Sequence, residues 1–105
     1  MVYRSKLEIR ADILSVAKDG SKPTNIMYEA DLNHKMLIRY LQDLLEGGML
    51  HFDKKTGIYY TTYRGSKHRK EILKTEKTYK KLLQRKKELK KEKVAILIDF
   101  GLQVK

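Results

Sequence analysis

The stretch from residue 24 to residue 64, TNIMYEADLNHKMLIRYLQDLLEGGMLHFDKKTGIYYTTYR, decides the fold of this 105-residue chain. Apolar residues recur at helical spacing in residues 24–30 and again in residues 34–46, which predicts two helices. Residues 31–33 form the short turn between them. The pair Gly47-Gly48 ends the second helix, since glycine favours the position just past a helix end.

Two strands are predicted directly after this glycine pair. Residues 49–52 and 58–61 are short and rich in β-branched and aromatic side chains, as strands are. The five residues between them, 53–57, carry a glycine near their end and suit a hairpin loop. Helix, turn, helix, strand, loop and strand in this order make a winged helix-turn-helix, which presents one helix and one hairpin loop on the same side.

Another helix is predicted on each side of this stretch. Ser5 and Glu8 have the spacing of a capping box, so a first helix begins there and continues to about residue 18. Thr62 is placed to cap a last helix over residues 63 to about 93, which spans roughly 46 Å. The sequence thus predicts a mainly α fold, with a winged domain at 1–64 and a C-terminal helical extension at 65–105.

The buried face of each short helix follows from its spacing. Asn33 is a suitable N-cap for the helix over 34–46, and Leu32 is placed to fill the gap between that helix and the one before it. The predicted inward-facing residues are Ile9, Ile13, Val16, Ala17, Ile26, Met27, Ala30, Leu37, Leu41, Leu44 and Leu45.

The last helix carries a sparse apolar seam at heptad spacing. Its predicted dimerisation residues are Ile72, Tyr79, Leu82, Leu89 and Ile96. The end of the chain, from Val94 to Leu102, is much more apolar than the lysine-rich centre, and such exposed apolar surface marks an interface. An antiparallel pair of helices keeps the lysine-rich centres outward, whereas a parallel pair stacks Lys86 on Lys86. The alternative is a monomer whose tail folds back on its own domain.

The charge of the chain is strongly positive and uneven. There are 24 basic and 13 acidic side chains, a net charge of +11, with a pI near 9.8. Residues 1–66 hold ten basic and eight acidic side chains, or +2, whereas residues 67–105 hold fourteen and five, or +9. This imbalance indicates nucleic acid as the first candidate partner and an acidic membrane surface as the second. The alternative is a solvated lysine-rich surface.

Composition also excludes several classes of protein. Cysteine is absent, so disulfides, thiolate zinc sites and cysteine nucleophiles are excluded, and an intracellular protein is expected. The N-terminus lacks the apolar core of a signal peptide, and the longest apolar run, Val94 to Ile98, is too short to span a bilayer. We therefore expect a cytoplasmic protein located in the nucleoid.

Candidate DNA contacts gather on the helix-turn-helix and the wing. Side chains at the N-terminal turn of a recognition helix reach base edges, where Arg or Lys pairs with guanine and Asn or Gln with adenine. The start of the helix near Pro23 suits phosphate, and the alternative there is simple capping. Arg4 and Lys6 are further candidates for backbone contacts. The predicted DNA-binding residues are Lys22, Thr24, Asn25, Asn33, His34, Lys35, Arg39, Gln42, Lys54 and Lys55.

No catalytic constellation is visible in the sequence. The glycines make no phosphate-binding motif, and the three histidines, His34, His51 and His68, are not at metal-binding spacing. We expect no enzyme, no cofactor, no metal and no small-molecule substrate. Two alternatives to duplex binding stay open: a protein-interaction module, and an RNA or single-strand binder that stacks bases on tyrosines.

Several segments of the chain resemble a known family. They include Ser5-Lys-Leu-Glu-Ile9, Asn25-Ile-Met-Tyr28, Ala30-Asp-Leu-Asn33 and Tyr60-Thr-Thr-Tyr-Arg-Gly65. Over residues 5 to about 70 the sequence resembles the small archaeal winged-helix proteins of the ten-kilodalton chromatin-type class and related archaeal transcription regulators. The resemblance implies an antiparallel coiled-coil dimer formed by the C-terminal helix. It also implies binding of double-stranded DNA through the helix over 34–46 and the wing.

The sequence departs from the family pattern in two places. Leu32-Asn33-His34 stands where relatives usually show Leu-Ser-Tyr, so the chemistry that faces the bases differs. The very apolar end, from Val94 to Leu102, is also unusual for the family and bears on the packing of the dimer.

Overall fold

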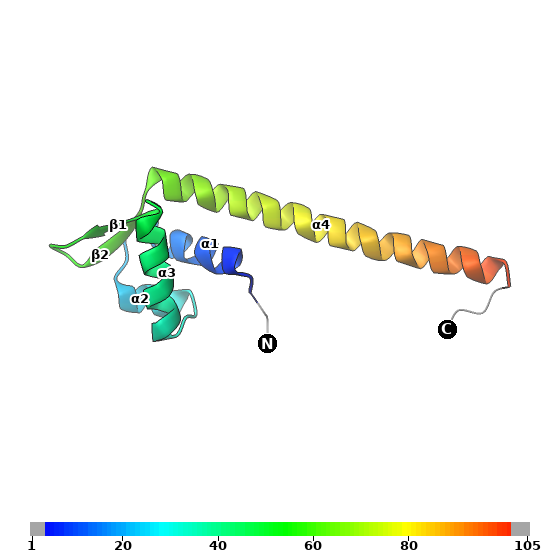
Figure 1. The fold of residues 1–105 in the computed structure, drawn as a ribbon, viewed down its shortest axis with the longest axis horizontal. Coiled ribbons are helices and arrows are strands. Elements are labelled where there is room, and N and C mark those ends of the chain that lie inside the picture. Colours follow the sequence, from blue (N-terminus) through cyan, green and yellow to red (C-terminus); the bar gives the residue numbers. More distant parts are fainter. Residues whose placement is uncertain (1–3, 102–105) are drawn as a thin grey trace. The chain divides into compact units, whose positions relative to one another are not determined.

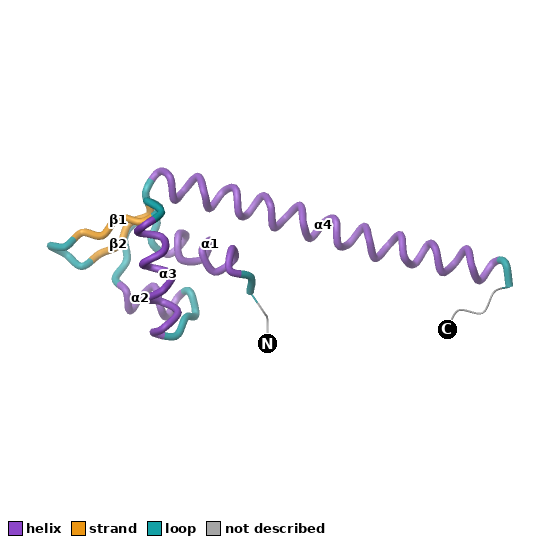
Figure 2. Tube along the Cα trace, in the orientation of Figure 1, coloured by secondary structure: helices purple, strands orange, loops and turns teal. Residues whose placement is uncertain are grey.

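The computed structural model describes residues 4–101 of the chain. The chain divides into two compact units between Lys74 and Thr75. The N-terminal unit thus includes the first turns of the last helix, beyond residue 64, where we predicted the winged domain to end. In chain order the elements are α1 (Lys6–Val16), α2 (Pro23–Glu29), α3 (His34–Glu46), β1 (Leu50–Asp53), β2 (Ile58–Thr61) and α4 (Tyr63–Asp99), as Figures 1 and 2 show.

α1 begins as predicted and ends two residues earlier than predicted. The Ser5 hydroxyl accepts the Glu8 N–H at 3.1 Å, which caps the first turn. At the other end the Ala17 carbonyl accepts N–H groups from Gly20 and from Thr61. Since these bonds replace the next helical hydrogen bond of α1, a tertiary contact with β2 fixes the end of the helix at Val16.

α2 and α3 form the helix-turn-helix. α3 has the predicted bounds, and α2 lies one residue earlier at each end than the predicted range of 24–30. Pro23 occupies the first turn of α2, and the Asn33 side chain caps α3 by accepting the Met36 N–H at 2.8 Å. Between them Asp31 adopts a positive φ of 52°, and Leu32 donates back to the Met27 carbonyl. This is a Schellman turn with an aspartate at its left-handed position.

The predicted apolar faces of the helices form a single core. Leu32 is buried as predicted, whereas Val16, Met27 and Leu45 are only partly buried at its edge. Leu14 and Tyr40 are buried although neither was assigned to the core. The buried cluster is Ile9, Ile13, Leu14, Ala17, Ile26, Ala30, Leu32, Leu37, Tyr40, Leu41, Leu44 and Leu50.

The wing is an antiparallel hairpin of β1 and β2 whose tip extends away from the three short helices (Figure 1). β1 begins at Leu50, one residue later than predicted, because the Met49 N–H donates to the Leu44 carbonyl and closes the end of α3. Ser21 adds a short bridge to the hairpin, exchanging both backbone hydrogen bonds with Tyr59 at 2.9 Å. No strand was predicted around Ser21. The bridge ties the start of the helix-turn-helix to the wing.

The first turn of α4 is fixed against the start of β1. Thr62 caps this turn by accepting the Gly65 N–H, and its hydroxyl donates to the Gly48 carbonyl at 2.7 Å. Gly65 is buried, and a Cβ at this position would collide with the backbone carbonyl of Met49. Glycine is therefore required here by close packing, although it disfavours a helix interior.

The C-terminal unit is the remainder of α4. The helix continues to Asp99, six residues past the predicted end, because the segment from Val94 to Ile98 contains no helix breaker. Gly101, with φ of 72°, follows as the expected stop. Residues 102–105, including the end of the apolar segment at Leu102, lie outside the described residues.

Candidate nucleic-acid interface

α3 divides into a basic and an acidic half along its exposed face. His34, Lys35 and Arg39 lie exposed in its first half, and Asp43 and Glu46 lie exposed in its second half. Duplex DNA carries phosphates along both edges of its grooves, so the first half attracts it and the second half repels it. The N-terminal half of α3 is therefore the half whose charge complements a polyanion.

The two amide side chains predicted on α3 differ in what they already contact. Asn33 uses its side-chain oxygen to cap the helix, so only its amide nitrogen is left to donate to a ligand. Gln42 directs its amide nitrogen toward the Glu46 carboxylate at 3.5 Å, a long contact on the exposed surface. The Arg39 guanidinium lies 5.8 Å from the centre of the Tyr40 ring. This contact helps to orient the Arg39 side chain.

The start of α2 presents exposed groups next to a structural hydrogen bond. Lys22 and Thr24 are exposed. The Asn25 amide donates to the Ser21 hydroxyl at 2.7 Å, and Ser21 is the residue that bridges to Tyr59. Asn25 therefore supports the junction of helix and wing, while Lys22 and Thr24 remain presented to solvent.

The tip of the wing carries the two predicted lysines. Lys54 and Lys55 are exposed in the four-residue loop between β1 and β2. The Asp53 carboxylate accepts the Lys55 N–H at 3.0 Å, and its carbonyl accepts the Gly57 N–H at 2.8 Å. Asp53 thus fixes the loop from which both ammonium groups extend.

Tyr59 of the wing and Tyr63 at the start of α4 differ in their burial. The ring centroids of Tyr59 and Phe52 lie 4.6 Å apart on the hairpin, so Tyr59 packs within the wing. Tyr63, in contrast, is 86% exposed.

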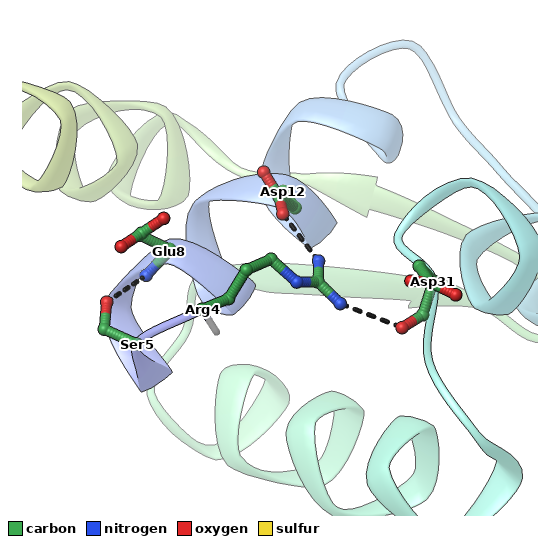
Figure 3. Close-up of polar contacts among 5 residues, drawn as sticks. All are labelled: Arg4, Ser5, Glu8, Asp12 and Asp31. Carbon is green, nitrogen blue, oxygen red and sulfur yellow. Dashed lines mark hydrogen bonds and ion pairs between the residues drawn. The ribbon is translucent and has the colours of Figure 1, made fainter. Parts of the chain in front are cut away.

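Arg4 joins α1 to the turn of the helix-turn-helix (Figure 3). Its guanidinium donates to the Asp12 carboxylate at 2.7 Å and to the Asp31 carbonyl at 2.8 Å. Arg4 was also predicted as a candidate for a DNA backbone contact, and these hydrogen bonds give it a role in the fold. The sequence around Arg4 does not indicate these two partners, which lie 8 and 27 residues further along the chain.

Sequence reasoning placed Ile38 on the outer side of α3 and gave it no function. Ile38 is 52% exposed on the same side of the helix as the predicted contacts. It borders a hollow of about 380 Å³ between α3 and the wing, and the hollow is lined by Ile38, Leu41, Gln42, Leu45, Glu46 and Tyr59. The sequence feature that could have identified it is a branched aliphatic residue on a helix face whose other residues are polar.

The predicted dimerisation residues fall in different surroundings. Ile72 is buried within the N-terminal unit, so it offers little surface to a partner. Tyr79, Leu82, Leu89 and Ile96 belong to the C-terminal unit and are about half exposed or more. These four residues remain available for contact with a second copy.

Among residues 4–101, no group of three or more acidic or histidine side chains is arranged to hold a metal ion. None of the helices described is long and apolar enough to cross a membrane.

Comparisons with known proteins agree with this geometry. A profile of the winged helix-turn-helix matches residues 3–84. Among solved structures, the chain is similar to Sso10a-2, a DNA-binding protein from Sulfolobus solfataricus, with a TM-score of 0.80 and 27% sequence identity. The similarity covers 84% of this chain and 95% of that one. A search of the curated proteins gave no match.

These matches confirm the resemblance to archaeal winged-helix DNA-binding proteins that the sequence segments indicated. They also confirm the predicted fold class, three helices with a two-stranded wing and a long C-terminal helix. The chain belongs to the winged helix-turn-helix family.

Proposed function

We propose that this protein binds double-stranded DNA, with the N-terminal half of α3 in the major groove and the wing tip on the flanking backbone. The observation that carries the proposal is the division of α3: one face is buried in the core, and the opposite face exposes His34, Lys35 and Arg39. The family and the DNA-binding neighbour point in the same direction and indicate a binding protein rather than an enzyme.

The remaining contacts divide by the chemistry that each side chain offers. Lys22, Thr24, Lys54 and Lys55 neutralise or donate to phosphates, which positions the protein without reading sequence. Lys35 and Arg39 are able to pair with guanine, and the Asn33 amide nitrogen is able to donate to a base edge. Gln42 and Asn25 already engage protein groups, so we assign them supporting roles.

We further propose that the working form is a homodimer assembled through the exposed apolar residues of the C-terminal unit. In this form the protein acts as a local transcription regulator or as a nucleoid-shaping protein. The excess of positive charge in residues 67–105 supplies a non-specific attraction to DNA that both roles use.

The experiment compares Arg39→Ala with Lys70→Ala on one labelled duplex of random sequence. Both variants lose one exposed positive charge, but only Arg39 lies on α3. We expect Arg39→Ala to weaken duplex binding by about 1–3 kcal/mol and Lys70→Ala to have a smaller effect. Equal effects would mean that net charge alone binds DNA. No duplex affinity in the wild type would indicate a protein-docking domain instead.

A second measurement separates the two roles. The protein is titrated into a mixed duplex library, and the bound fraction is sequenced. Enrichment of one site indicates a regulator, whereas uniform retention of the library indicates a nucleoid protein.

A further inference from the structure

The exposed side of α3 is polar with one exception. Around Ile38 stand His34 one turn before, Gln42 one turn after, and Arg39 beside it, all exposed. Ile38 itself is 52% exposed. Its apolar surface is therefore presented on the same face that carries the proposed DNA contacts.

Ile38 also has apolar surface beside it. The hollow between α3 and the wing continues from Ile38 past Leu41 and Leu45 to the ring of Tyr59. Its polar boundary is formed by Gln42 and Glu46, of which Glu46 carries the charge that repels phosphate. The hollow thus suits an uncharged apolar group of DNA that lies near the backbone phosphates but is not part of them.

We infer that Ile38 and this hollow receive the 5-methyl group of thymine, which makes Ile38 a specificity-determining residue for A·T pairs. The inference rests on the proposed entry of α3 into the major groove. Thymine displays the only methyl group among the four bases in that groove, and an apolar side chain recognises it by contact. Lys35 and Arg39 flank Ile38 with positive charge, so a duplex is the partner that this face complements.

The test uses two duplexes of the same A·T-rich sequence, one with thymine and one with deoxyuridine in its place. Deoxyuridine keeps the base pair and the O4 acceptor and lacks only the methyl group. We expect the wild type to bind the thymine duplex about threefold to fivefold more tightly for each methyl group contacted, as removal of one methyl from water predicts. A G·C duplex that carries 5-methylcytosine is expected to bind more tightly than its unmethylated form.

Ile38→Ala is the test variant, and Leu7→Ala is its matched control. Both remove an exposed aliphatic side chain from a helix of the N-terminal unit, but Leu7 lies on α1. Ile38→Ala leaves the rest of the hollow in place and is expected to lose most of the preference for the thymine duplex, whereas Leu7→Ala should keep the wild-type preference. Ile38→Val, which keeps a branched side chain, is expected to retain a reduced preference.

Three results would overturn the inference. Equal affinity of the wild type for both duplexes shows that the methyl group is not contacted. A preference of unchanged size in Ile38→Ala shows that Ile38 does not contact the methyl group. Absence of binding to any duplex removes the proposed function together with this inference, whereas the first two results leave that function standing.

Discussion

At the residue scale, individual hydrogen bonds determine which predicted side chains are available to a ligand. Asn33 illustrates this point, because the same side chain was predicted as a helix cap and as a base contact. The structure uses its oxygen for the cap and leaves only the nitrogen for recognition. Arg4 shows the opposite case, since both of its hydrogen bonds serve the fold.

The first prediction concerns Arg4. Replacement by alanine removes the link between α1 and the Asp31 carbonyl and should lower the free energy of unfolding by about 1 kcal/mol. A charged hydrogen bond is worth more than this when buried, but Asp12 is 48% exposed and water weakens the pair. Thermal denaturation followed by circular dichroism measures the change.

Arg4→Lys provides the control for this prediction. Lysine keeps the charge but lacks the two-pronged geometry that reaches Asp12 and Asp31 together, so an intermediate stability is expected. Unchanged stability of Arg4→Ala would contradict a structural role for this residue.

At the element scale, local sequence determined most of the fold. The bounds of α3 and β2 were predicted correctly, and α2 lies one residue earlier than its predicted range. For α3 the reason is that Asn33 and the glycine pair act within a few residues of each boundary. The end of α1 was misplaced because it depends on a hydrogen bond from Thr61 of β2. The start of β1 was misplaced by one residue because Met49 still closes the end of α3. Tyr40 was missed although it lies three and four residues from Leu37 and Leu44, the spacing of the buried face.

Less of the candidate interface than of the fold could be predicted from the sequence. Exposure of His34, Lys35 and Arg39 follows from helix periodicity alone. The bond between Asn25 and Ser21 and the hollow beside Ile38 depend on how the wing packs against the helices. Spacing along one helix contains no information about such packing.

The second prediction tests the packing of α4 onto β1. Gly65→Ala should destabilise the protein by about 1–3 kcal/mol, because the added methyl group meets the Met49 carbonyl. In an unpacked helix the same change is stabilising, since alanine is the better helix former. The sign of the change therefore distinguishes packing from helix propensity in a urea titration.

Thr75→Ala is the matched control for Gly65→Ala. It introduces alanine at an exposed position of the same helix, and its effect should stay within about 0.5 kcal/mol. A stabilising Gly65→Ala would show that the first turn of α4 does not dock tightly on β1.

At the scale of the whole molecule, the central question is how the apolar residues of the C-terminal unit are covered. Tyr79, Leu82, Leu89 and Ile96 recur near heptad spacing and are exposed in the single chain. In the proposed dimer, a second copy in antiparallel orientation would cover them while the lysines between them stay in water. The dimer is a proposal that the apolar spacing supports.

The third prediction follows from this proposal. The wild type should sediment as a dimer at micromolar concentration, and Leu82→Ala combined with Leu89→Ala should shift it toward the monomer. Alanine is a good helix former, so circular dichroism of the monomeric variant should show little loss of helix. The control pair, Lys77→Ala with Lys87→Ala, changes exposed positions of the same helix and should remain dimeric. A monomeric wild type would contradict the proposed dimer.

The most direct test of duplex binding by this protein is its salt dependence on a random duplex, with a single strand of the same sequence for comparison. If the protein neutralises Z phosphates, the logarithm of the association constant falls against the logarithm of salt with a slope near −0.9Z. We predict a steep slope and a clear preference for the duplex. No duplex binding at low salt, or a preference for the single strand, would contradict the account.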